Sequence, residues 1–499
     1  MPNTFAYLML FSWPLVATVM FRVLPLQKAL IWTLIGGFLF LPSATQIKLP
    51  MLPALDKSLI PAVSALVLCV IMSSRVDPFR DRAGRTGRTF IIGLLGLLVA
   101  TPLLTTLQNP EAIPIGPTFL PGLRIYDAFS MISSIVVAVI PFYIGLRYLN
   151  TQDGHRLLLQ AFAVGALVYS LPVLFEVRMS PQLHTWIYGF FPHDFVQHIR
   201  AGGYRPVVFL NHGLMVGNFF CLAILSALTL WREGLREGRP ASGWFYAAVW
   251  LIFALVASKN LGALGITAVL SMFVVFTGKR IQTSFAMVVA LVVILYPMLR
   301  GAGHIPVDAV HELATSVDEE RAASLKFRLD NEDALLAHAN EKPVFGWGNW
   351  GRNQLYDDVT GEMISVTDGS WIILIGMYGW IGYIAHFGLL TLPVFFYYLR
   401  GKEFGPSLIT PGLMLVLSAA LIDLIPNAGL VNYVWLMAGG LAGYVLWPSA
   451  GTVGKAKAGL PQATGAATVD PAQGLATWVM ASAEGAGRKP RSARHGRRD

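Results

Sequence analysis

Two basic residues stand beside long apolar stretches, where a charged side chain is unexpected, and a third stands at the edge of the apolar face of a predicted loop helix. Arg205 lies in RPVVFLNHGLMVG, Lys259 in SKNLGALG and Arg328 in FRLDNEDALLAH. Ionisable groups at membrane depth are costly and by default indicate a functional site, although Arg205 and Lys259 also suit snorkelling to lipid headgroups. Because cationic groups are how proteins hold phosphates, the three together predict a diphosphate site. The alternative for Arg328 is a surface pair with Glu332.

A second group of candidate residues lies in NEKPVFGWGNWGRNQ, residues 340–354. Its glycines, Gly348 among them, allow backbone angles that other residues avoid. Trp347 and Trp350 suit the membrane–water boundary, and a flat ring beside accessible backbone also suits a sugar. With Arg352, these residues predict one wall of a glycan cavity.

Two further polar residues stand where apolar runs begin. Asp368 precedes the run SWIILIG, at a helix N-terminus whose dipole favours an anion or a phosphate. His212 follows Arg205 in the same motif and is a weaker member of the predicted glycan cavity. The alternative for His212 is a packed, hydrogen-bonded histidine.

The composition indicates a membrane protein. Of 499 residues, 55% are hydrophobic and 13% charged, and the mean hydropathy is +0.58, whereas soluble domains carry about 25% charged residues. The two cysteines, Cys69 and Cys221, fall inside apolar runs and indicate neither a disulfide framework nor a metal site. Both suit the role of small buried hydrophobes.

A membrane-spanning helix needs about 20 apolar residues, and thirteen runs approach or meet that length. The first is interpreted as a helix rather than a signal peptide, because it lacks a basic start and a cleavage motif. We therefore expect an all-α polytopic membrane protein with about 12–14 transmembrane helices. The runs are 5–22, 29–43, 58–74, 89–107, 126–146, 157–176, 207–231, 242–257, 261–277, 284–300, 371–399, 408–425 and 430–447.

Lysines and arginines in short loops predict the orientation. Residues 75–88 hold five arginines and 232–240 hold three. If these loops are cytoplasmic, the N-terminus lies outside and the C-terminus inside, and Arg205, Lys259 and Arg328 share the outer side. The long loop 301–370, which contains thirteen acidic and five basic residues up to 368, lies there too.

Four regions follow from this pattern. Residues 1–300 hold transmembrane helices 1–10, 301–370 the large outer loop, 371–447 helices 11–13, and 448–499 a disordered basic cytoplasmic tail. Inside the loop, Ser316 with Glu319 makes a capping box and predicts a helix that ends near Asn340, ahead of Pro343. The basic charge indicates membrane topology and anionic lipid rather than nucleic acid.

The chain resembles the O-antigen ligase and O-antigen/exopolysaccharide polymerase superfamily of bacterial inner membranes. The resemblance covers roughly 200–400 and rests on RPVVFLNHGLMVG, on SKNLGALG with Lys259 in place of arginine, and on FRLDNEDALLAHANEKPVFGWG followed by TDGSWIILIGMYGWIG. It implies a multi-pass protein of the bacterial inner membrane whose large loop is periplasmic.

The resemblance also implies a reaction that needs no metal or other cofactor. The donor is an oligosaccharide on undecaprenyl diphosphate, the acceptor is a sugar hydroxyl, and Arg205, Lys259 and Arg328 hold the diphosphate. Arg328 also stabilises the charge that grows on the leaving group. Ligases of the family carry a histidine motif where this chain has TDGS, so Asp368 is the nearest candidate for the general base.

This departure favours a polymerase that joins repeat units into exopolysaccharide, capsule or O-antigen. The alternatives are an O-antigen ligase, which transfers the glycan to lipid A-core or another acceptor, and a lipid-linked glycan transporter or flippase. Expected partners are the lipid-linked oligosaccharide, the glycan acceptor, the lipid bilayer, and chain-length or export proteins of the same pathway. A metal site formed by Asp357, Asp358 and Glu362 is a further alternative to a solvated acidic loop.

Overall fold

The computed structural model describes residues 1–49, 52–72, 85–200, 202–305, 312, 315 and 319–446. The predicted tail, the arginine-rich segment up to residue 84 and Ser316 lie outside these residues. About 71% of the structure is helical, and sheet is nearly absent from the part that is described. The chain is an all-α polytopic membrane protein, as predicted.

Each of the thirteen predicted apolar runs coincides with a helix. Helices satisfy every backbone hydrogen bond internally, which a lipid environment requires. Within the described chain, seven helices are long and apolar enough to cross a membrane, and several others are apolar but shorter, so the count of 12–14 crossings stays a prediction. The helices are α1 (Thr4–Val23), α2 (Leu26–Phe40), α3 (Leu59–Met72), α4 (Arg85–Leu107), α5 (Ile125–Tyr148), α6 (Gln152–Met179), α8 (Gly213–Arg236), α9 (Ser242–Ala257), α10 (Leu261–Phe276), α11 (Lys279–Gly301), α14 (Ser370–Leu399), α15 (Ile409–Asp423) and α16 (Asn432–Leu446).

Small residues bring α5 and α16 into close contact. A Cβ atom on Gly439 would lie 2.0 Å from Phe142 O, and one on Gly145 would lie 2.3 Å from Leu436 O. In membranes, helices associate through such close backbone approach, because lipid supplies no hydrophobic drive between them. Helices α8, α15 and α16 are buried along most of their length.

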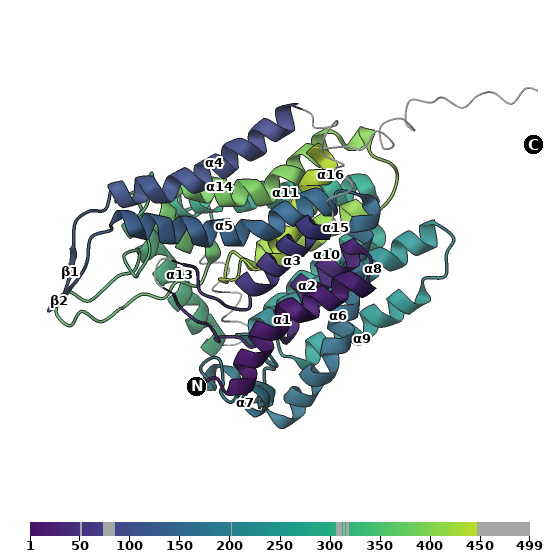
Figure 1. Ribbon diagram of the computed structural model, residues 1–499, viewed down its shortest axis with the longest axis horizontal. Helices are drawn as coiled ribbons and strands as arrows, with labels where there is room; N and C mark the ends of the chain where they lie inside the picture. Colours follow the sequence, from purple (N-terminus) through teal and green to yellow (C-terminus); the bar gives the residue numbers. More distant parts are fainter. Residues whose placement is uncertain are drawn as a thin grey trace, which may run out of the picture. The chain divides into compact units, whose positions relative to one another are not determined.

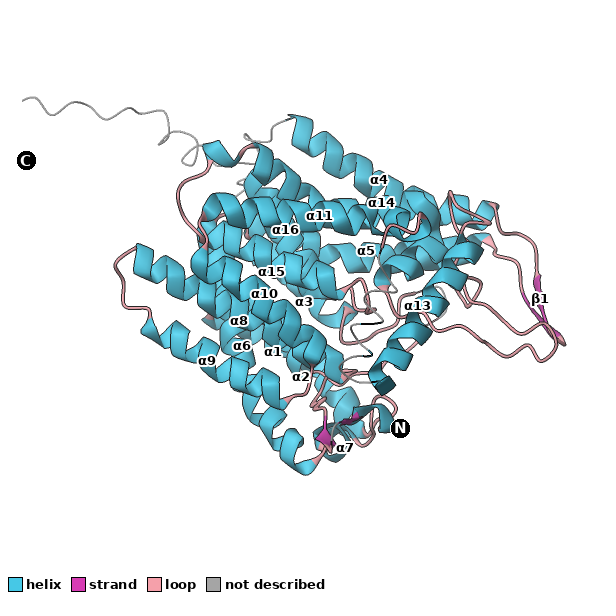
Figure 2. Cartoon of the chain, turned by 180° about the vertical axis from the view of Figure 1, so that it is seen from behind, coloured by secondary structure: helices cyan, strands magenta, loops and turns pink. Residues whose placement is uncertain are grey.

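Most of the shorter elements gather at one end of the helices (Figures 1 and 2). The shorter elements are the hairpin of β1 (Ile113–Ile115) and β2 (Thr118–Leu120), α7 (Leu183–Tyr188), the hairpin of β3 (Ile199–Arg200) and β4 (Gly203–Tyr204), and α13 (Glu319–Ala339). Both hairpins are antiparallel. Helix α13 confirms the helix predicted inside the long loop, and it ends one residue before the expected Asn340.

Helix α14 is interrupted at Gly379, whose φ of 66° lies in the left-handed region. The glycine-rich loop fills this break: Trp347 N–H donates to Gly376 O at 2.8 Å, and Trp380 N–H donates to Pro343 O at 2.8 Å. Backbone N–H and C=O groups that lose their helical partners at membrane depth need other hydrogen-bond partners of this kind. The loop that contains Trp347 is thus a structural partner of a broken helix.

Candidate functional site

A cavity of about 220 Å³ brings together three of the residues predicted from the sequence, namely His212, Arg328 and Asp368. They come from the start of α8, from α13 and from the mouth of α14. Asp423, at the end of α15, also lines it. The other lining residues are His193, Gln197, Asn211, Leu214, Met215, Asn218, Asn427, Ala428, Gly429, Val431 and Tyr433.

Arg328 and Asp368 form an ion pair, with Arg328 Nε 3.1 Å from Asp368 Oδ2. The side chains are 40% and 33% exposed, so water still reaches both. The alternative partner expected for Arg328, Glu332, forms no ion pair with it. Ser370 N–H holds the mouth of α14 in place by donating to Leu424 O at 3.0 Å.

His212 caps α8, because its Nδ1 accepts the Leu214 N–H at 3.0 Å. The proton of the neutral ring is therefore on Nε2, where it is available as a hydrogen-bond donor. Burial lowers the pKa of His212 to about 3, helped by the neighbouring rings of His198 and His193 and by the charges of Arg205 and Arg328. His212 thus stays neutral across the ordinary pH range and suits a donor rather than a base.

Arg205 lies directly under this helix start. A Cβ atom on Gly213 would meet Arg205 Cδ and Cγ at 2.5 Å. The backbone that follows is held by the buried carboxylate of Glu176, which accepts Val207 N–H at 2.8 Å and Val208 N–H at 2.7 Å. Val208 has a φ of 55°, a conformation that a β-branched residue adopts only when its surroundings enforce it. The hydrogen bonds to Glu176 hold the backbone that follows Arg205 and thereby keep Arg205 beside the cavity.

Lys259 occupies a different position. It lies between α9 and α10 with a φ of 57°, and its ammonium group packs against Gly203 of the β3–β4 hairpin. Lys259 does not line the cavity that holds Arg328. The structure therefore brings Arg205, His212, Arg328 and Asp368 together and places Lys259 beside the hairpin.

Sequence reasoning missed Lys57. It lines a second cavity of about 200 Å³ that shares Asn211, Met215 and Val431 with the first. Lys57 Nζ donates to Ser43 Oγ and to Phe209 O, both at 3.0 Å. Burial lowers the pKa of Lys57 to about 7, against the opposing charge of Asp56. The available signal was a lysine just before an apolar run on the predicted outer side.

Glu332 was considered only as a surface partner for Arg328, and the structure buries it to 6% exposure. It lies one helical turn after Arg328 on α13. Burial raises the pKa of Glu332 to about 7, and the nearby charge of Arg300 opposes this rise. Arg300 itself donates to Asp333 Oδ2 at 2.9 Å. A buried carboxyl that titrates near neutrality therefore adjoins the candidate base, Asp368.

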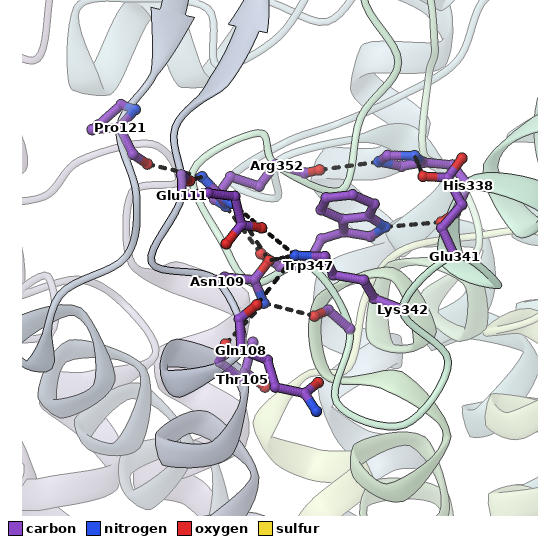
Figure 3. Close-up of polar contacts among 11 residues, drawn as sticks. Thr105, Gln108, Asn109, Glu111, Pro121, His338, Glu341, Lys342, Trp347 and Arg352 are labelled. Atoms are coloured by element: carbon purple, nitrogen blue, oxygen red, sulfur yellow. Dashed lines mark hydrogen bonds and ion pairs between the residues drawn. The ribbon is translucent and has the colours of Figure 1, made fainter.

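The four candidates of the glycine-rich loop lie apart from the Arg328 cavity. Trp347 Nε1 donates to His338 O at 2.8 Å, and the two rings stack with centroids 4.4 Å apart (Figure 3). Gly348 N–H donates to Met377 O at 2.9 Å. Trp350 and Arg352 line a separate cavity. None of these four residues lines the cavity of Arg328.

The acidic loop that contains Asp357, Asp358 and Glu362 is held by hydrogen bonds to its own backbone N–H groups. Asp357 Oδ1 accepts Val359 N–H at 3.0 Å and Thr360 N–H at 2.7 Å, and these bonds lower the pKa of Asp357. Within the described ranges, no three His, Cys, Asp or Glu side chains are grouped so as to hold a metal ion.

No family model, curated protein or solved structure matches the chain. Its class is therefore defined by the fold and the site alone. It is a polytopic α-helical membrane protein with a polar cavity at the end of its helices where the shorter elements gather.

Proposed function

We propose that the protein is a membrane glycosyltransferase of the polymerase type. It joins undecaprenyl-diphosphate-linked oligosaccharide repeat units into exopolysaccharide, capsule or O-antigen. The observation that carries this proposal is the meeting of Arg328, Asp368 and His212 in one cavity, with Arg205 beside it. Cations, a carboxylate and a neutral donor are the groups that glycan transfer from a diphosphate needs.

In this reaction an acceptor sugar hydroxyl attacks the anomeric carbon of the donor glycan. The bond between that carbon and the diphosphate oxygen breaks, and undecaprenyl diphosphate leaves with the bonding electrons. Asp368 takes the hydroxyl proton. Arg328 and Arg205 stabilise the charge on the leaving group. His212 donates its Nε2–H to the substrate, and neither a metal nor another cofactor takes part.

Lys57 adds a further cation to this scheme. Its cavity adjoins that of Arg328, so a substrate reaching across both meets positive charge at each end. Lys259 remains a candidate for the diphosphate, but its ammonium packs against Gly203 and does not line the cavity of Arg328.

The protein is placed by this proposal in the bacterial inner membrane. The α13 loop, β1–β2 and α7 are periplasmic, and the C-terminus is cytoplasmic. This arrangement is supported by the gathering of those elements at one end of the helices (Figure 2) and by the arginine-rich loops expected at the other end.

Two other functions share these features, namely an O-antigen ligase and a lipid-linked glycan transporter. One assay separates all three. The purified chain in nanodiscs receives lipid-diphosphate oligosaccharide from its host as the only glycan, with EDTA present. A ladder of products supports the polymerase. A single transfer that needs an added acceptor supports the ligase, and no transfer to any acceptor leaves the transporter.

Arg328→Ala tests the site itself. It should abolish the ladder while the protein stays folded in the membrane, because the leaving group loses its cation. Lys326→Ala is the matched control, since Lys326 is an exposed cation on the same helix. Normal product from Arg328→Ala would remove the central residue of the proposal.

A further inference from the structure

A cavity of about 410 Å³ lies between the start of α5 and the loop that follows Trp347. It is separate from the Arg328 cavity, because the two share no lining residue. Tyr126, Asp127 and Ser130 line it from α5. Trp350 and Arg352 line it from the loop.

The walls of this cavity are fixed by a buried guanidinium. Arg352 is 1% exposed, and it donates to Pro121 O at 2.9 Å, Glu111 O at 3.1 Å and Trp347 O at 3.2 Å (Figure 3). Lys342 joins the same two loops through an ion pair with Glu111 and a bond to Asn109 Oδ1 at 2.9 Å. The cavity is therefore preformed, as small-molecule sites usually are.

Trp350 is held over this cavity at a cost in backbone strain. Its φ of 59° lies in the left-handed region, where a bulky residue is an outlier. Such strain persists only where the surroundings enforce it, and it clusters at functional positions. Trp350 remains 49% exposed, and so does Tyr126.

The chemistry of the lining selects a neutral, hydroxyl-rich ligand. Arg352 donates to three backbone oxygens and to Asn109 Oδ1, and the Glu111 carboxylate lies 3.7 Å from its Nη2, so its N–H groups are occupied and its charge is partly compensated. Asp127 is 6% exposed, and its Oδ2 accepts Arg124 N–H at 2.7 Å. A carboxylate has about four acceptor sites, so it retains capacity for hydroxyl groups while it repels phosphate. Tyr and Trp supply rigid contact area that is apolar on the face and polar at the tip.

We propose that this cavity is a carbohydrate subsite, which holds a part of the glycan remote from the reacting bond between Trp350 and Tyr126. The assignment of the glycan rests on the proposed function. An acyl chain fits less well, because it would desolvate Asp127 and Ser130 without replacing their hydrogen bonds.

The test measures binding of one defined probe to the full chain in nanodiscs. The probe is the oligosaccharide released by mild acid from the host's lipid-linked donor, which carries neither lipid nor phosphate. Saturation-transfer NMR or calorimetry gives its affinity. Trp350→Gly should weaken binding about tenfold or more, and Trp350→Phe should retain most of it.

Trp350→Gly also keeps the test independent of folding. Glycine adopts positive φ without strain, so the relief of backbone strain offsets part of the packing that is lost with the ring. Trp186→Ala is the matched control, because Trp186 is a 58% exposed tryptophan on α7, away from the cavity. Unchanged affinity in Trp350→Gly would overturn the subsite, and so would displacement of the probe by phosphatidylglycerol vesicles.

The two proposals fail separately. Glycan transfer that proceeds with the same acceptor KM and product length in Trp350→Gly would remove the subsite and leave the transferase. Probe binding that depends on Trp350, in a protein that transfers no glycan, would leave the carbohydrate subsite and remove the transferase.

Discussion

Arg328 Nε and Asp368 Oδ2 lie 3.1 Å apart, and this ion pair joins α13 to the mouth of α14 at the edge of the cavity. A partly exposed pair of this kind contributes only about 0–1 kcal/mol. In the proposed reaction, a diphosphate, with more charge than one carboxylate, would therefore displace Asp368 from Arg328 at little cost. The proposal thus couples donor binding to release of the candidate base.

Asp368→Asn tests this coupling. The variant should lower kcat about 10²-fold or more, because general-base catalysis is worth that much. It should also lower the KM for the donor, because Arg328 no longer has a competing carboxylate. Initial rates against donor concentration give both values. Asp358→Asn, in the neighbouring acidic loop, should change neither, and a raised donor KM in Asp368→Asn would contradict the competition.

The helices were predictable because a spanning helix needs a long apolar run, which the sequence displays directly. Arg328 was singled out because it stands at the edge of an apolar helix face, and Asp368 because it directly precedes an apolar run. Glu332 was misread, since its burial depends on how α13 packs on α14. The contact between Trp347 and the broken part of α14 could not be predicted either, because nothing in the apolar run around Gly379 indicates that the helix breaks there.

Lys57→Gln should raise the KM for the donor about tenfold, since a hydrogen bond to a charged group is worth roughly 1.5–3 kcal/mol. The pKa of Lys57 is about 7 in the ligand-free protein, so its ammonium form is lost as the pH rises above 7. The wild-type donor KM should therefore rise between pH 6 and pH 8. The donor KM of Lys57→Gln should not show this rise.

Lys48→Gln is the control for Lys57→Gln. Lys48 is an exposed lysine in the same α2–α3 loop, so its removal changes the net charge equally without touching the cavity. Equal KM values for the two variants would show that Lys57 acts only as a structural link to Ser43 and Phe209.

Gly346→Ala should destabilise the protein by at least about 2 kcal/mol. Gly346 has a φ of 68°, and a Cβ atom there would lie 2.6 Å from Gly379 N. Left-handed backbone and overpacking each cost on the order of 1–3 kcal/mol. Gly265→Ala in α10 should instead be neutral or stabilising, because no atom lies within 4 Å of its added methyl group. Thermal unfolding in detergent compares the two variants. Equal unfolding midpoints would show that the glycine-rich loop does not stabilise the break in α14.

Glu332→Gln should change how stability depends on pH. The pKa of Glu332 is raised from 4.5 to about 7 in the folded protein, so folding favours the protonated form. The stability contributed by that proton is complete below about pH 4.5 and is lost as the pH rises through 7. The difference corresponds to ~3 kcal/mol. A glutamine keeps the shape without the buried charge, so the variant should unfold at a higher temperature than the wild type at pH 8, and the two should converge near pH 5.

Asp330→Asn provides the comparison on the same helix, because Asp330 is exposed. Its unfolding temperature should follow the wild type at every pH. If Glu332→Gln also tracked the wild type from pH 5 to pH 8, Glu332 would be ionised in the folded protein. That outcome would contradict the raised pKa of Glu332.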